Sequence, residues 1–193
     1  QGFLAPRVPA VFSPLEFKDV KVCAQTGTTN RDNAADFLTT NNVTHEIVEV
    51  GSPDEMIDAY QKGRCNVLTA DSSQLHALQI RLAKPGDSVI LPDIISKEPL
   101  GPVVRQDDPQ WFEIVKWTNF AMLEAEELGV TSKNLDAALN SKKPAVRRLV
   151  GTDGAFGEQI GLTKDWVARI VRAVGNYGES FERNVGSKSS LGI

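Results

Sequence analysis

The sequence predicts an α/β fold built on a parallel sheet. In the first half of the chain, short apolar runs typical of strands alternate with segments that carry the apolar spacing and end signals of helices. Strands that are joined by short connections through helices pair in parallel and carry helices on their faces. After residue 93 the alternation stops and long helical stretches follow, which predicts additional C-terminal helices.

Four strands are expected in the first half, at 20–25, 45–50, 65–70 and 88–93. Three helices are expected between them, at 30–41, 52–63 and 71–84. The second helix is the best marked, with Ser52 as N-cap, Pro53 at the first position and Gly63 as its end. Glu55 is expected to close a capping box with Ser52. Pro92 places the fourth strand at a sheet edge or at a strand end.

The second half is predicted to be helical. Asp108 and Pro109 open a long helix that ends at Gly129 and carries two tryptophans and two phenylalanines, which requires a broad buried face. Short helical pieces are expected at 130–162, and a last helix begins with Thr163 as its cap and ends at Gly175. The stretch before residue 17, rich in proline and aromatic residues, is expected to be an extended lead-in.

Composition excludes several classes of protein. The chain has 193 residues, 41% of them hydrophobic and 24% charged, as in an ordinary soluble domain. A net charge of −4 offers no basic field, so no nucleic-acid partner is expected. No apolar run is long enough for membrane insertion, and residues 1–12 lack the pattern of a signal peptide. Cys23 and Cys65 are either two separate buried thiols or, if their strands are neighbours, a bridged pair.

The turn Gln25-Thr26-Gly27-Thr28-Thr29 is the first candidate site. It joins the carboxyl end of a strand to a helix, and ligands of open α/β sheets bind at such strand ends. The backbone N–H groups of a helix N-terminus suit a carboxylate or a phosphate. Thr28 or Thr29 is equally well explained as the N-cap of the helix, and the turn lacks the spacing and the lysine of a P-loop.

Asp71 is the second candidate, because it follows the strand at 65–70. Its carboxylate either caps the next helix together with Gln74 or faces the same crevice and pairs with a cation. An anion site beside a cation site is what a zwitterionic amino acid requires. His45 and His76 have no partners at metal-ligand spacing. No catalytic residue, metal site or cofactor is predicted.

Four stretches carry a resemblance to a known family: "VCAQTGTTN" at 22–30, "GRCNVLTADSSQL" at 63–75, the stretch from "EPLGPVVR" to "GVTSKN" at 98–134, and "VGNYGESFERNVG" at 174–186. Across nearly its whole length the chain resembles the periplasmic general amino-acid-binding proteins of ABC transporters, in the extracellular solute-binding protein family 3. The resemblance implies a type II periplasmic-binding-protein fold, in which two lobes close on an L-amino acid and deliver it to a membrane permease.

The resemblance also assigns roles to residues. It implies that Thr28 and Thr29 hold the α-carboxylate of the ligand, with Gln25 and Thr26 nearby, and that Asp71 holds the α-ammonium. It implies an oxidising periplasm, and therefore a disulfide between Cys23 and Cys65.

The resemblance assigns 15–97 to lobe 2, the ligand-binding α/β domain. It assigns 1–14 and 98–193 to hinge segments and to the C-terminal helical part of lobe 1, with most of lobe 1 absent. The aromatic helix beginning at Pro109 is then expected to repack onto lobe 2 or to form a homodimer. Two alternatives share the fold: a cyclohexadienyl-dehydratase-like enzyme, which needs a general acid in the cleft, and the effector-binding domain of a transcription regulator.

Overall fold

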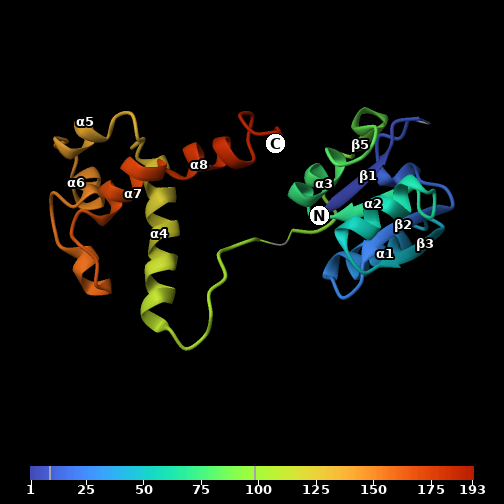
Figure 1. Ribbon diagram of the computed structural model, residues 1–193, viewed down its shortest axis with the longest axis horizontal. Coiled ribbons are helices and arrows are strands. Elements are labelled where there is room, and N and C mark those ends of the chain that lie inside the picture. Colours follow the sequence, from blue (N-terminus) through green and yellow to red (C-terminus); the bar gives the residue numbers. More distant parts are fainter. Residues whose placement is uncertain (9, 98) are drawn as a thin grey trace. The chain divides into compact units, whose positions relative to one another are not determined.

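The computed structural model describes residues 1–8, 10–97 and 99–193. The chain divides into two compact units, Gln1–Pro99 together with Ile193, and Leu100–Gly192. Each unit is described by itself (Figure 1). The assignment of 15–97 to one lobe, and of 1–14 and 98–193 to hinge segments and a second lobe, stays a prediction.

Unit 1 is built on a five-stranded sheet in the order β3-β2-β4-β1-β5. The strands are β1 (Gly2–Pro6), β2 (Val20–Gln25), β3 (His45–Val50), β4 (Val67–Ala70) and β5 (Ser88–Ile90). β2 pairs in parallel with β3 and with β4. β1 is antiparallel to both β4 and β5, so β5 runs in the same direction as β4. The four predicted strands and their common direction are confirmed, and β1 makes the sheet mixed rather than wholly parallel.

Helices cover both faces of this sheet. They are α1 (Thr29–Thr40), α2 (Pro53–Gln61) and α3 (Ser72–Gln79), with short 3-10 turns η1 (Pro14–Glu16) and η2 (Pro85–Asp87). α1 packs on the face that carries Val22 and Val67, whereas α2 and α3 pack on the face that carries Cys23 and Leu68. Neighbouring residues of each strand thus point to opposite cores, as the strand repeat of two requires.

The predicted end signals of α2 are mostly confirmed. Ser52 Oγ accepts a hydrogen bond from Glu55 N at 3.2 Å, Pro53 is the first residue, and Gly63 has φ 71° just after the helix. The Glu55 carboxylate accepts from Gly51 N at 2.7 Å. The expected capping box is therefore wrong in its second half, because the glutamate reaches one residue further back than Ser52. α3 is shorter than predicted and ends at Gln79.

A disulfide joins Cys23 and Cys65, whose Cα atoms are 5.6 Å apart. Cys23 lies in β2, and Cys65 lies two residues before β4, which is the neighbour of β2 in the sheet. Both cysteines are buried. The pairing implied by the family resemblance is confirmed, and it joins the two strands that lead to the candidate site.

Unit 2 is helical. Its elements are α4 (Pro109–Glu127), α5 (Leu135–Leu139), α6 (Pro144–Val150), η3 (Phe156–Ile160), α7 (Trp166–Val174) and α8 (Tyr177–Asn184). Its core joins one side of α4 to α6 and α7 through residues such as Ala125, Leu149 and Val171. The Asp108 cap is confirmed by its hydrogen bond from Trp111 N at 2.9 Å.

Two predictions about the last helices need correction. α7 begins at Trp166 with Asp165 as N-cap, so Thr163 is not the cap; its backbone oxygen accepts a hydrogen bond from Trp166 N at 3.1 Å instead. α8 was not predicted as a separate helix. It begins with a complete capping box between Asn176 and Glu179.

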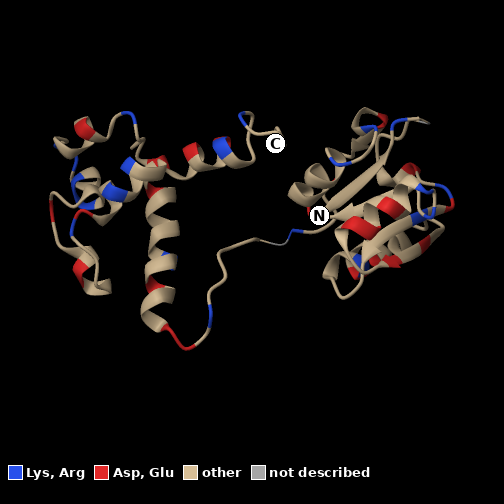
Figure 2. Ribbon diagram, viewed as in Figure 1, with Lys and Arg blue, Asp and Glu red and all other residues tan. Residues whose placement is uncertain are grey.

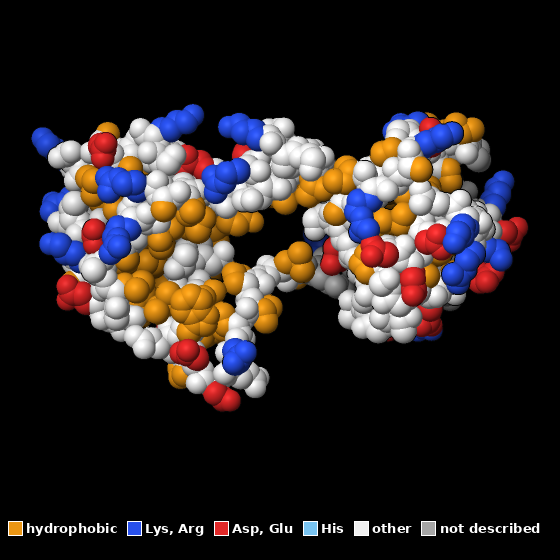
Figure 3. Space-filling model, viewed as in Figure 1, with side chains coloured by type: hydrophobic (Ala, Val, Ile, Leu, Met, Phe, Trp, Pro, Cys, Tyr) orange, Lys and Arg blue, Asp and Glu red, His pale blue; other side chains and the backbone are white. Residues whose placement is uncertain are grey.

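The aromatic side chains of α4 are half exposed within the structure. Trp111, Phe112 and Phe120 retain 51%, 49% and 49% of their accessible surface. Hydrophobic side chains gather over α4 in the space-filling view (Figure 3). The expected large apolar face is confirmed, whereas its repacking onto lobe 2 and the homodimer both stay predictions.

Glu179 gives unit 2 a pH-dependent contact. Its carboxylate accepts hydrogen bonds from Ser132 N at 2.9 Å, from Ser132 Oγ at 2.6 Å and from Asn176 N at 3.0 Å. Desolvation, the largest single influence, raises the pKa of Glu179, but these hydrogen bonds and Lys133 together lower it below its ordinary value.

Because the folded-state pKa of Glu179 is lowered, its contribution to stability is present above the unfolded pKa and is lost as pH falls through the folded pKa. We therefore expect Glu179→Gln to destabilise unit 2 at pH 7 and to flatten the acid limb below about pH 4.5. Urea unfolding from pH 7 to pH 3 measures this. Glu182→Gln is the control on the same helix, and equal pH profiles for both variants would contradict the assignment.

Candidate functional site

The Gly-Thr-Thr turn is held by its own side chains rather than by a helix cap. Thr26 N donates to Val50 O at 2.9 Å, which continues the pairing of β2 with β3. Gly27 then has φ 75°, which turns the chain at a position where a side chain would be strained. Thr28 Oγ1 donates to Gln25 O at 2.7 Å, which locks the turn.

α1 consequently begins without a side-chain cap. Thr28 occupies the N-cap position with extended backbone angles, but its side chain makes no capping hydrogen bond. The interpretation of Thr28 as an ordinary N-cap is therefore correct for its position and wrong for its side chain. The first N–H groups of α1 keep the partial positive charge that attracts an anion, because no oxygen of Thr28 neutralises them.

Asp71 lies at the carboxyl end of β4, in the N-cap position of α3. Its backbone oxygen accepts from Leu75 N at 2.8 Å, but its side chain makes no capping hydrogen bond, so the expected pair with Gln74 does not form. The carboxylate is half-buried. Among the described residues it has neither a hydrogen-bond partner nor an ion pair. A charge held in that state is available to a cation from solution.

The two candidates lie side by side. In the parallel pairing of β2 with β4, Cys23 is opposite Leu68. Continuing this register by three residues places Thr26 opposite Asp71. Neighbouring strands lie about 4.8 Å apart, so the anion-attracting turn and the free carboxylate are one strand spacing from each other. This separation suits the two charged groups of one amino acid.

Arg31 does not supply the site with a free positive charge. Its guanidinium pairs with Asp32 at 2.6 Å and with Glu49 at 3.1 Å. The hydrogen bond with Asp32, followed by the charge of Glu49, raises the pKa of Arg31 above its ordinary value. Lysine, arginine and acidic residues are interspersed over unit 1 (Figure 2). The turn would therefore bind a carboxylate mainly through backbone N–H groups.

Sequence reasoning missed two buried polar residues beside the turn, Gln1 and Asn30, which are 7% and 8% exposed. Asn30 begins the buried stripe of α1 that continues with Ala34 and Leu38 and faces the sheet. Its Oδ1 has no hydrogen-bond partner among the described residues. A polar residue at the first position of an i, i+4, i+8 stripe was the available signal.

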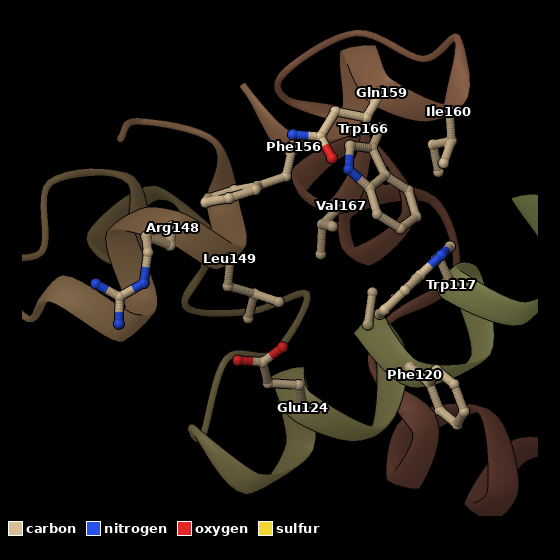
Figure 4. Close-up of a pocket in the computed structure, with 11 residues that line it drawn as sticks. Trp117, Phe120, Glu124, Arg148, Leu149, Phe156, Gln159, Ile160, Trp166 and Val167 are labelled. Atoms are coloured by element: carbon tan, nitrogen blue, oxygen red, sulfur yellow. The ribbon is translucent and has the colours of Figure 1, made fainter. Parts of the chain in front are cut away.

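Unit 2 contains a separate groove of about 380 Å³. Trp117, Phe120, Phe156 and Trp166 form aromatic walls, and Glu124 lies on its edge (Figure 4). None of Gln25, Thr26, Thr28, Thr29 or Asp71 lines it. Its apolar walls belong to the exposed face of α4, and they do not have the paired charges that the strand ends of unit 1 provide.

The fold and the strand-end site define unit 1 as a lobe of the type II periplasmic-binding-protein class. A solved ABC transporter periplasmic binding protein from Brucella ovis, with glutathione bound, matches the structure with a TM-score of 0.91 and 42% identity. The match covers 100% of this chain and 61% of that protein. The predicted fold class is confirmed.

Sequence relatives point to the same family, although no family model matches the chain. The general L-amino acid-binding periplasmic protein AapJ of Rhizobium johnstonii is 47% identical over the whole chain. The glutamate/glutamine/aspartate/asparagine-binding protein BztA of Rhodobacter capsulatus is 43% identical. The chain is thus related to the amino-acid-binding proteins of ABC transporters, and it spans 57% of the length of these two relatives. These relatives are binding proteins rather than enzymes, so the dehydratase and regulator alternatives are not favoured.

Proposed function

We propose that unit 1 carries half of the ligand site of a solute-binding protein that captures L-amino acids for an ABC transporter. The observation that carries the proposal is the unpaired carboxylate of Asp71, one strand spacing from the uncapped N-terminus of α1. A ligand that bears an ammonium and a carboxylate on one carbon matches both groups at once.

The backbone N–H groups after Gly27, together with the Thr28 and Thr29 residues, would bind the α-carboxylate of the ligand. Asp71 would bind the α-ammonium through charge-assisted hydrogen bonds. Gln25 and Thr26 border the same strand end. The relatives are named for free amino acids, and the Brucella ovis protein holds glutathione, whose γ-glutamyl end also carries an α-ammonium and an α-carboxylate. These shared groups support a site that recognises the amino-acid backbone.

The proposed location is the periplasm, and the proposed partner is the membrane permease of the transporter. The names of the relatives support both. The buried disulfide supports an oxidising compartment. No helix among the described residues is long and apolar enough to cross a membrane.

An NMR titration tests the proposal. L-Glutamate is added to the ¹⁵N-labelled chain up to about 10 mM, because a single lobe is expected to bind with a Kd of about 1 mM or weaker. We expect the amide signals of Gly27, Thr29 and Asn30, and those around Asp71, to shift together.

Two related compounds are the controls for this titration. Glutarate lacks the ammonium, and 4-aminobutyrate carries its two charged groups on different carbons. Both are expected to produce much smaller shifts than L-glutamate. No shift at either strand end with L-glutamate, or equal shifts with glutarate, would refute the proposed function.

A further inference from the structure

The side chain of Gln1 lies at a junction of four segments. Its Nε2 donates to Asn30 O at 2.7 Å and to Thr69 Oγ1 at 2.8 Å. Its Oε1 accepts from Asn33 Nδ2 at 3.1 Å and from Ser96 Oγ at 3.1 Å. Both donors and both acceptor positions of the amide are therefore occupied. One buried side chain thus joins the β1 end of the sheet, the first turns of α1, β4 and the segment after β5.

The partners of this amide belong to both halves of the candidate site. Asn30 lies in the first turn of α1, directly after the Gly-Thr-Thr turn, and Thr69 lies two residues before Asp71. Thr69 Oγ1 passes the network on to Gly2 O at 2.9 Å. The relative position of the α1 N-terminus and the end of β4 is therefore fixed by a hydrogen-bonded chain as well as by the sheet.

The fourth partner lies on the segment that leads out of unit 1 toward residue 100. Ile95 N donates to Gln1 O at 3.1 Å, and the Gln1 nitrogen donates to Ser96 O at 3.0 Å. Asn33 Nδ2 also donates to Ser96 Oγ at 3.2 Å. A change in the spacing of α1 and β4 would therefore be felt at Ser96 through the same amide.

We propose that Gln1 is a positioning residue, which holds the first turn of α1 at the correct distance from Asp71 and couples that distance to the outgoing segment at Ser96. The proposal rests on the proposed function. A buried amide with every position occupied suits this task, because any displacement of one partner leaves a buried group unpaired and costs more than the hydrogen bond itself returns. The site is thus pre-organised before the ligand arrives.

Gln1→Glu tests the proposal, because it preserves the size of the side chain and its acceptor oxygens but removes both donors. Gln106→Glu is the matched control, since Gln106 is an exposed turn residue in unit 2. With L-glutamate as the probe, we expect the unaltered chain to show ligand-induced shifts at Asn30 and Ser96 with the same midpoint. We expect Gln1→Glu to weaken the affinity about tenfold and to abolish the shift at Ser96.

A purely structural role predicts a different result, in which thermal stability falls while the shift at Ser96 persists; that result would overturn the proposal. If Gln1→Glu does not fold, Ser96→Ala removes a single donor to the amide and is expected to uncouple the Ser96 amide from binding while the shift at Asn30 remains. Persistent coupling of residues 95–97 to Asn30 in Ser96→Ala would also overturn it.

Failure of the proposed function is recognised separately. It leaves the unaltered chain without ligand-induced shifts at Gly27 or Asp71. The ligand-free spectra then decide the network: Gln1→Glu is expected to shift the amides of Arg31, Thr69 and Ser96, which Gln106→Glu leaves in place. Unchanged signals at Arg31 and Ser96 in Gln1→Glu would show that the amide does not couple these segments.

Discussion

Asp71→Asn is expected to weaken amino-acid binding by about 2 kcal/mol, or roughly thirtyfold in Kd. The asparagine keeps the shape of the side chain but replaces a full negative charge with a dipole, so the ammonium of the ligand loses its counter-ion. The estimate lies below the largest values for buried charge pairs, because Asp71 is half-buried and water screens part of the interaction. An NMR titration of the variant with L-glutamate measures the change.

Stability separates this effect from damage to the fold. Because the Asp71 carboxylate neither caps α3 nor pairs with another described residue, its neutralisation removes no internal contact, and the free energy of unfolding should change little. Asp36→Asn makes the same change of charge on the exposed side of α1 and should leave the affinity unaltered. Equal affinities for Asp71→Asn and the unaltered chain would remove Asp71 from the site.

The fold was predictable from the sequence where a pattern is local. The strands at 20–25 and 45–50 were located to the residue, because their apolar runs end at polar turns. β1 was not predicted, since its short sequence carries two consecutive apolar residues between a glycine and a proline, and its partners lie more than sixty residues away. Antiparallel insertion between β4 and β5 depends on that long-range pairing, which no local pattern encodes.

The same distinction applies to the candidate site. The Gly-Thr-Thr turn and Asp71 were located because each directly follows a predicted strand, and the carboxyl ends of parallel strands meet at one edge. Whether their side chains cap the following helices was undecided from sequence, because both uses require the same residue types. The Gln1 network was invisible, since it joins residues separated by 29 to 95 positions along the chain.

Loss of the disulfide is the change expected to affect stability most. Cys23 and Cys65 are 42 residues apart, and in the chain-entropy model a loop of that length stabilises the folded state by about 4 kcal/mol. That is a large share of the 5 to 15 kcal/mol typical of a whole domain. Cys23→Ala/Cys65→Ala should therefore unfold at a much lower urea concentration in unit 1, whereas unit 2, which holds neither cysteine, should keep its midpoint.

A reducing agent provides the control. Dithiothreitol should destabilise the unaltered chain slowly, because both sulfurs are buried, and should leave the double variant unchanged. Equal midpoints for the oxidised chain and the double variant would contradict the prediction. The bridge closes a loop that contains α1, β3 and α2, and it lies three residues before Thr26 and six before Asp71. Reduction should therefore lower ligand occupancy through the unfolded fraction of unit 1, which would make amino-acid binding dependent on an oxidising compartment.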